Sequence, residues 1–156
     1  MKYVITGGAG FIGSHIAEEL SKKHEVIIVD NLLSGKESNI ASLSIQFKQG
    51  SITDLSFLME VFKGVDGIFH QAAITSVAGS VTSPFQTHEV NCTGTLHVLL
   101  AARDCGVKKV VCASSASVYG DSPVLPKIET MLPCPLSPEN IMHGFFLSSM
   151  GYRQSH

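Results

Sequence analysis

Three evenly spaced glycines follow the first apolar run of the sequence. Gly7, Gly10 and Gly13 fit the spacing G-x-x-G-x-x-G, and Gly8 replaces Gly7 in the related spacing G-x-G-x-x-G. The run before them, "KYVIT", is rich in β-branched residues, and apolar residues recur every fourth position from Ile12, as in a helix. A glycine-rich turn between a strand and a helix lets a phosphate approach the backbone N–H groups at the helix start. The spacing therefore predicts a dinucleotide site, with a purely structural turn as the alternative.

An acidic residue at the end of the second apolar run supports this prediction. Asp30 follows the run "VIIV" and lies 17 positions after Gly13, where dinucleotide sites place the carboxylate that accepts hydrogen bonds from a ribose. A carboxylate there repels a 2′-phosphate, so we predict NAD rather than NADP as the cofactor. Asn31 is neutral, and Lys36 is the one nearby cation that argues otherwise. Asp30 can also cap the turn that follows it, which is compatible with binding.

These residues require a sheet whose strands end at one edge. Beyond the first two, further strands are predicted in "IQFKQG", "VDGIFHQAA" and "VKKVVCASS", with helical patterns between them. Asp54 is placed to cap the helix that follows it, and we predict one long helix over Thr87–Cys105. The run Val26–Val29 is continuously apolar, which is typical of a parallel strand covered on both faces. The pattern predicts an α/β protein with a doubly wound parallel sheet of about five strands.

The composition argues against several other kinds of protein. A net charge of −2 gives no support for nucleic-acid binding. No apolar run reaches the roughly 18 residues that span a bilayer, and "MKYVITGG" has no signal-peptide pattern. The four cysteines form no C-x-x-C pair, and the seven histidines lack metal-ligand spacing. We therefore predict a reduced, cytoplasmic protein that has no metal site and whose histidines are ordinary surface or core residues.

Six stretches of the sequence together resemble the extended short-chain dehydrogenase/reductase family, and within it the NAD-dependent sugar-nucleotide epimerases of the UDP-glucose 4-epimerase type. They are "VITGGAGFIGSHI", "VIIVDNLLSGK", "GSITD", "FHQAA", "VNCTGTLHVLLAA" and "SSASVYGDS". In this order and spacing they cover residues 1–138. The resemblance implies a Rossmann-type NAD-binding domain over these residues and a UDP-sugar as the substrate.

The resemblance also implies roles for individual positions of this sequence. The implied cofactor residues are Gly7, Gly10, Phe11, Ile12 and Gly13 at the pyrophosphate, Asp30, Asn31, Ser34 and Gly35 at the adenosine ribose, Ser51 and Ile52 at the adenine, Gln71, Ala72 and Ala73 at a strand end that the cofactor passes closely, and Asn91 beside the cofactor. Ser51 stands where the family usually has aspartate. For Asn91, a helix-capping or core-bridging role is the alternative.

The catalytic part of the resemblance is incomplete. Ser115, in "SSASVYG", matches the hydroxyl that hydrogen-bonds the sugar oxygen being oxidised, with Ser114 as its ambiguous neighbour. Tyr119 lies in the same motif and resembles a structural position. Family catalysis implies a Tyr-x-x-x-Lys pair, whose tyrosine takes the proton of the sugar 4-hydroxyl and whose lysine lowers the pKa of that tyrosine. The helix that carries this pair in the family begins with "SPY", but here Glu139 follows "SP" and His143 takes the lysine position.

Residues 139–156 keep neither the family pattern nor a regular period. We predict that they are a non-family tail, frame-shifted or disordered, with a natural truncation or an engineered change as alternatives, and that the substrate subdomain is absent. The expected function is the NAD-binding portion of a UDP-glucose/UDP-galactose 4-epimerase, inactive or nearly so as this chain. A non-catalytic NAD-binding or protein-interaction module is the alternative. We also expect self-association, because the fifth strand is left as an exposed sheet edge.

Overall fold

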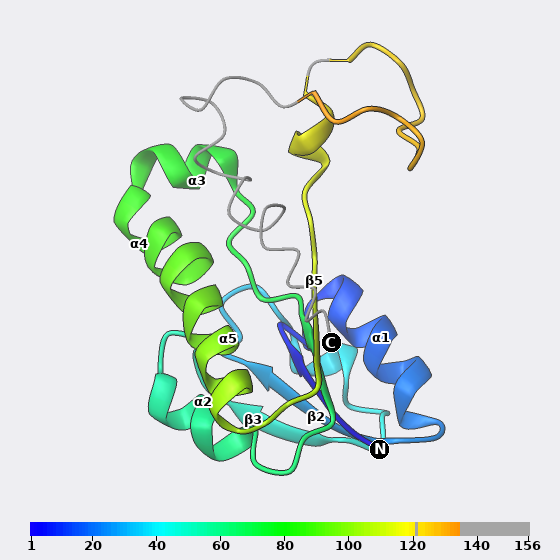
Figure 1. The fold of residues 1–156 in the computed structure, drawn as a ribbon, viewed down its shortest axis with the longest axis vertical. Coiled ribbons are helices and arrows are strands. Elements are labelled where there is room, and N and C mark those ends of the chain that lie inside the picture. The colour runs from blue at the N-terminus through cyan, green and yellow to red at the C-terminus, as the bar shows by residue number, and fades with distance from the viewer. Residues whose placement is uncertain (121, 135–156) are drawn as a thin grey trace. The chain divides into compact units, whose positions relative to one another are not determined.

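A computed structural model describes residues 1–120 and 122–134 of the chain (Figure 1). Its backbone contacts divide the chain into two units, Met1–Cys112 and Ala113–His156, which are described separately. The strands are β1 (Lys2–Thr6), β2 (Glu25–Asp30), β3 (Gln46–Gln49), β4 (Gly67–His70) and β5 (Lys109–Cys112). The helical segments are α1 (Phe11–Ser21), α2 (Leu55–Val61), α3 (Val77–Thr82), α4 (Pro84–His88), α5 (Thr95–Asp104), the 3-10 turns η1 (Glu37–Asn39) and η3 (Ala116–Tyr119), and the π-helical turn η2 (Glu89–Gly94). Within the described part of the chain, no helix combines the length and the apolar character that crossing a bilayer requires.

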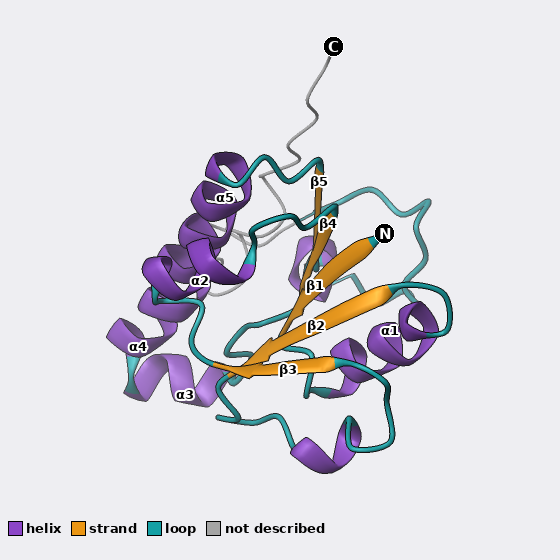
Figure 2. Cartoon of the chain, turned by 90° about the horizontal axis from the view of Figure 1, so that it is seen from below, coloured by secondary structure: helices purple, strands orange, loops and turns teal. Residues whose placement is uncertain are grey.

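The five strands form one parallel sheet in the order β3-β2-β1-β4-β5. Figure 2 shows α1 on one face of this sheet and α2 and α5 on the other. The chain moves outward from β1 to β3 and then returns to β4 on the opposite side of β1, so the direction of winding reverses between β1 and β4. Open α/β sheets bind ligands at such a reversal, beyond the carboxyl ends of the strands. The predicted fold class, a Rossmann-type doubly wound parallel sheet of about five strands, is confirmed.

The sheet is covered by apolar side chains on both faces, which explains the continuous apolar run of β2. Val29 belongs to a core cluster that contains Leu58 of α2 and Val98 of α5. Its neighbour Ile28 belongs to a second cluster, with Ala17 of α1. Successive residues of a strand point to opposite faces, so each must be apolar when both faces are buried.

The chain is helical without a break over most of the predicted helix Thr87–Cys105, but this helix contains a π-helical turn that was not predicted. Residues Glu89–Gly94 form a π-helical turn, and α5 begins only at Thr95. A π-helical turn bonds each residue to the fifth one along rather than the fourth, and therefore rotates the helix faces on its two sides relative to each other. The apolar period could not reveal the turn, because Val90 and Gly94 within it face the core at the same spacing of four as Val98 of α5.

The predicted cap of α2 is confirmed and leads to a stability prediction. Asp54 Oδ1 accepts a hydrogen bond from Phe57 N–H at 2.9 Å. Replacing Asp54 with alanine leaves that N–H without its acceptor, so we expect the free energy of unfolding to fall by about 1 kcal/mol. Asp54→Ser keeps a capping oxygen and is expected to lose only a few tenths of that amount. Urea denaturation of both variants tests the prediction, and equal losses would contradict it.

Candidate functional site

The glycine-rich turn joins β1 to α1 and is held from both sides. Gly7 N–H donates to the Val29 carbonyl of β2 at 2.8 Å, and Gly10 N–H donates to the Gly7 carbonyl at 3.1 Å. Gly7 has a φ of +68°, which other residues rarely adopt. A Cβ on Gly13 would lie 2.3 Å from the Gly7 carbonyl oxygen, so a larger residue would push α1 away from the turn. The turn is therefore built around two positions that require glycine.

The start of α1 offers backbone N–H groups to an anion. Gly10 is the N-cap residue, and as glycine it has no side chain to accept hydrogen bonds from the first turn. The first N–H groups of an α-helix have no partner within the helix, and they carry the positive end of the helix dipole. The side chains of Phe11 and Ile12, which the resemblance places at the pyrophosphate, are 79% and 60% exposed. Their backbone N–H groups, rather than these side chains, suit an interaction with phosphate.

Asp30 ends β2 and connects the glycine turn to the loop that follows. Its Oδ2 accepts from Ala9 N–H at 3.0 Å, and its Oδ1 accepts from Leu32 N–H at 2.8 Å. A carboxylate offers about four acceptor positions, so both oxygens retain capacity for a ribose hydroxyl. A Cβ on Gly35 would lie 2.9 Å from both oxygens, so glycine at this position keeps the carboxylate accessible. Asp30 thus caps the next turn, as the alternative proposed, and is also placed to bind a ligand.

The loop after β2 is fastened to the glycine turn through a single carbonyl. The Ala9 carbonyl oxygen accepts from Lys36 N–H at 3.0 Å and from Asn39 Nδ2 at 2.8 Å. In the same loop Leu32 has a φ of +61°, an uncommon conformation for a residue other than glycine. Such conformations persist where surrounding contacts impose them, and here the hydrogen bond to Asp30 contributes. The loop and the turn therefore form one wall of a site.

A cleft of about 250 Å³ opens beyond the carboxyl ends of β1, β2, β3 and β4. It brings together most of the predicted cofactor residues, namely Gly7, Gly10, Asp30, Asn31, Ser34, Ser51, Ile52, Gln71, Ala72 and Ala73. The other predicted cofactor residues do not line it, and these are Phe11, Ile12, Gly13, Gly35 and Asn91. Gly13 and Gly35 nevertheless lie next to residues that line the cleft, since Gly13 packs against Gly7 and Gly35 packs against Asp30.

The cleft also contains Gly50, which precedes Ser51 in the stretch "GSITD", and residues that the sequence analysis missed, namely Val29, Leu33, Ile74, Thr75, Ser76 and Val90. Ile74, Thr75 and Ser76 follow β4, and the rule that ligands lie beyond strand ends would have found them. Leu33 and Val90 gave no signal, because a single apolar residue in a loop or helix does not mark a site.

Ser51 lines the cleft and also hydrogen-bonds to Thr53 in the turn that follows it. Its Oγ accepts from Thr53 N–H at 3.2 Å and lies 2.8 Å from Thr53 Oγ1, where either hydroxyl can donate. A hydroxyl can both donate and accept. Where the family usually has a charged acceptor, this chain therefore presents an uncharged group with both capacities.

Asn91 lies in η2 and hydrogen-bonds to the backbone of Ile74, a residue that lines the cleft. Its Oδ1 accepts from Ile74 N–H and its Nδ2 donates to the Ile74 carbonyl, both at 2.8 Å. These two hydrogen bonds fix the backbone of Ile74, which lines the cleft, to the π-helical turn. The core-bridging alternative describes this geometry, and a direct contact with the cofactor stays a prediction.

Ser115 is the one residue of this chain that was predicted to be catalytic. Ser115 belongs to the second unit, where it is half-buried and its carbonyl accepts from Val118 N–H at 3.2 Å. Its catalytic role stays a prediction. Glu139, His143 and the rest of the predicted tail 139–156 lie outside the described residues. Among residues 1–120 and 122–134, no three His, Cys, Asp or Glu side chains are grouped as a metal site would require.

Known proteins share both the sequence pattern and the fold. Residues 3–141 match the sequence model of the NAD dependent epimerase/dehydratase family. A UDP-glucose 4-epimerase from Klebsiella pneumoniae is 35% identical over 139 residues, which cover 83% of this chain and 100% of that sequence. A UDP-glucose 4-epimerase from Streptomyces lividans is 36% identical over 88% of this chain and 43% of its own length.

A solved structure extends the comparison to three dimensions. The UDP-glucose 4-epimerase of Thermus thermophilus in complex with NAD matches with a TM-score of 0.78 and 38% identity, over 92% of this chain and 47% of that one. This chain thus spans about half the length of the Streptomyces and Thermus proteins. The predicted resemblance is confirmed, and the chain belongs to the NAD dependent epimerase/dehydratase family.

Proposed function

We propose that this chain binds NAD in the cleft and forms the NAD-binding portion of a UDP-sugar 4-epimerase. The observation that carries the proposal is the position of Asp30, whose carboxylate lines the cleft and holds the glycine turn through Ala9. The pyrophosphate would lie against the N–H groups at the start of α1, and the adenosine ribose against Asp30. The adenine would lie toward Ser51, because β3 neighbours β2 on the side away from β1.

The residues of the chain would bind and orient the cofactor, and NAD when bound supplies the hydride acceptor for oxidation of a sugar. The glycine turn would hold the phosphates through its backbone. Asp30 would accept hydrogen bonds from the ribose hydroxyls and repel a 2′-phosphate. The segment after β4, from Ala72 to Ile74, would form the wall that faces the glycine turn. In the whole protein, Ser115 would hydrogen-bond the sugar hydroxyl.

The substrate part of the proposal is supported by the relatives. The Klebsiella and Streptomyces proteins are UDP-glucose 4-epimerases. We propose UDP-glucose and UDP-galactose as the substrates of the whole protein, with the cytoplasm and carbohydrate metabolism as its setting, and residues 1–138 as its NAD-binding domain. Glu139 and His143 stand at the positions of the catalytic tyrosine and lysine. This chain would therefore convert UDP-sugars about 10²–10⁴ times more slowly than an epimerase that has this pair, or not at all.

Self-association through the edge of β5 belongs to the same proposal. Among the described strands, β5 pairs only with β4, and its Val111 is 40% exposed. A strand edge of this kind offers backbone N–H and C=O groups to a second chain. A second copy could therefore continue the sheet.

Calorimetric titration with NAD and NADP tests the cofactor proposal. Asp30→Asn removes the charge while keeping the size of the side chain. Hydrogen bonds to a charged group contribute about 1.5–3 kcal/mol, so we expect NAD to bind this variant about 10- to 100-fold more weakly. Wild-type protein should prefer NAD to NADP by at least about tenfold, since the 2′-phosphate would meet the carboxylate.

A matched control removes a nearby charge that does not face the cleft. Glu37 is exposed on η1, and Glu37→Gln should leave NAD affinity within about twofold of the wild type. Circular dichroism confirms that each variant is folded before titration. The proposal fails if folded wild-type protein binds neither coenzyme, or if the two variants lose equal affinity. Rapid interconversion of UDP-galactose and UDP-glucose by this chain would contradict the expected loss of turnover.

A further inference from the structure

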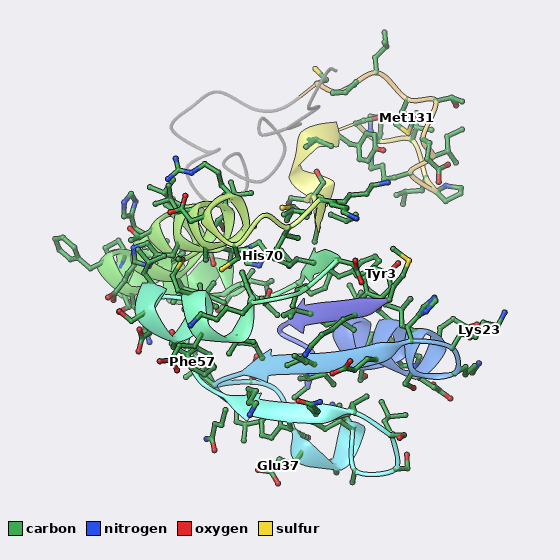
Figure 3. All side chains as sticks on the ribbon, turned by 60° about the horizontal axis from the view of Figure 1, so that its bottom comes forward. Tyr3, Lys23, Glu37, Phe57, His70 and Met131 are labelled. Atoms are coloured by element: carbon green, nitrogen blue, oxygen red, sulfur yellow. The ribbon has the colours of Figure 1, made fainter. Side chains whose placement is uncertain are left out.

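Three polar side chains lie in the core directly behind the cleft. Thr6 ends β1, His70 ends β4 and Thr95 begins α5, and each is at most 2% exposed. His70 Nδ1 lies 2.6 Å from Thr6 Oγ1, and His70 Nε2 lies 3.0 Å from Thr95 Oγ1. Figure 3 shows His70 next to the green helical segment that contains Thr95. Buried polar groups of this kind must be fully hydrogen-bonded to be tolerated.

The position of each hydrogen in this chain of contacts follows from the partners. Thr95 Oγ1 donates its hydrogen to the Asn91 carbonyl at 2.7 Å, so toward His70 it can only accept. Nε2 of His70 must therefore carry a hydrogen. A neutral imidazole has one N–H, so Nδ1 is bare and accepts from the hydroxyl of Thr6. The Thr6 oxygen in turn accepts from Ala72 N–H at 3.4 Å.

The result is a relay in which every donor points the same way, from Ala72 through Thr6, His70 and Thr95 to Asn91. Both ends of the relay hold the wall of the cleft that follows β4. Ala72 itself lines the cleft. Asn91, at the other end, binds both backbone groups of Ile74, which also lines it.

The wall that the relay holds is in contact with the glycine turn. A Cβ on Gly7 would lie 2.6 Å from Ala72 N and 2.8 Å from Ala72 Cα. Thr6 directly precedes Gly7 in the chain, so one relay member joins the turn to the opposite wall. A displacement of the wall would therefore change the space in which a pyrophosphate must lie.

We infer that His70, as its neutral Nε2–H tautomer, is a positioning residue for the dinucleotide, and that the hydroxyls of Thr6 and Thr95 set the affinity of the cleft without touching the ligand. This inference rests on the proposed binding of NAD. None of Thr6, His70 and Thr95 lines the cleft, so their effect on affinity must pass through Ala72 and Ile74.

The test compares two substitutions at Thr95. Thr95→Val has nearly the same shape but no hydroxyl, which leaves His70 Nε2–H without its acceptor and removes one donor from the Asn91 carbonyl. Thr95→Ser retains the hydroxyl. We expect the Kd for NAD, measured by calorimetry, to rise at least about tenfold in Thr95→Val and to stay within about twofold of the wild type in Thr95→Ser.

A control separates positioning from loss of stability. Val98 lies in the same helix, is fully buried and takes no part in the relay. Val98→Ala should destabilise the fold by leaving a cavity and still bind NAD within about twofold of the wild type. The inference is overturned if Thr95→Val binds NAD as the wild type does, or if Val98→Ala loses as much affinity.

Nitrogen-15 NMR of the His70 ring tests the relay without a ligand. We expect a bare Nδ1 and a protonated Nε2 in the wild type, and the opposite tautomer would overturn the inference. If folded wild-type protein binds no NAD, the proposed function and the positioning role both fail. If it binds NAD but Thr95→Val has no effect, only the positioning role fails.

Discussion

Replacing Gly7 with alanine is expected to lower the free energy of unfolding by about 3 kcal/mol and to abolish NAD binding. Two physical effects combine at this position. The φ of +68° costs a residue with a Cβ about 1–2 kcal/mol. The Cβ would also lie 2.6–2.8 Å from backbone atoms of Gln71 and Ala72, which cannot rotate away, and such overpacking typically costs about 1–3 kcal/mol. The displaced backbone of Ala72 is part of the cleft wall, so binding is lost with stability.

Two other glycines isolate these effects. Gly64 has a φ of +70° with no atom within 4 Å of the position of a Cβ, so Gly64→Ala should show the backbone cost alone, about 1–2 kcal/mol. Gly13 is helical and its Cβ would lie 2.3 Å from the Gly7 carbonyl oxygen, so Gly13→Ala should show the steric cost without a left-handed φ, reduced by the higher helix propensity of alanine. Urea denaturation of the three variants gives the comparison. A loss in Gly7→Ala no larger than that in Gly64→Ala would show that the turn can move away from the strand end.

The glycines and the carboxylate could be predicted from the sequence because their requirements are local. Gly7 and Gly13 are demanded by backbone geometry within one turn, and Asp30 follows its strand at the spacing that the ribose requires. The sheet could also be predicted, since strands that are buried on both faces need continuous apolar runs such as Val26–Val29. For each of these features, the residues that identify it are close together in the sequence.

The relay could not be predicted, because its partners are brought together by packing between distant elements. Thr6 and His70 are 64 positions apart, and His70 and Thr95 are 25 positions apart. His70 is a core histidine with a hydrogen-bond partner at each ring nitrogen, as predicted for a buried histidine, but nothing in the sequence indicated which residues those partners are. The hydrogen bonds between Asn91 and Ile74 could not be predicted either. They depend on the π-helical turn that contains Asn91, and no period in the sequence marks this turn.

Acid is expected to destabilise this fold through His70 by about 3 kcal/mol between pH 6.5 and pH 4. Burial lowers the pKa of His70 to about 4 from its ordinary value of 6.5. The geometry agrees with that direction, because a hydrogen on Nδ1 would force the Thr6 hydroxyl to turn its own hydrogen away from the ring, and no carboxylate among the described residues is hydrogen-bonded to the ring to stabilise its charge. Above pH 6.5 the ring is neutral in both the folded and the unfolded chain, so it adds no pH dependence there.

The sign follows from which state binds the proton. Between pH 6.5 and 4 the unfolded chain binds a proton at His70 that the folded chain excludes, so stability falls by about 1.4 kcal/mol per pH unit as the pH is lowered. Below about pH 4 both states bind it and this dependence ends.

Other groups titrate in the same pH range, and the variant His70→Asn distinguishes the contribution of His70 from theirs. This variant should be less stable at pH 7, yet its stability should fall less steeply toward pH 4. Ile68→Val, a buried substitution in the same strand without an ionisable group, should keep the wild-type slope. Parallel curves for His70→Asn and the wild type would mean that the folded protein accepts the proton on His70 as readily as the unfolded chain does, and that burial does not keep the ring neutral.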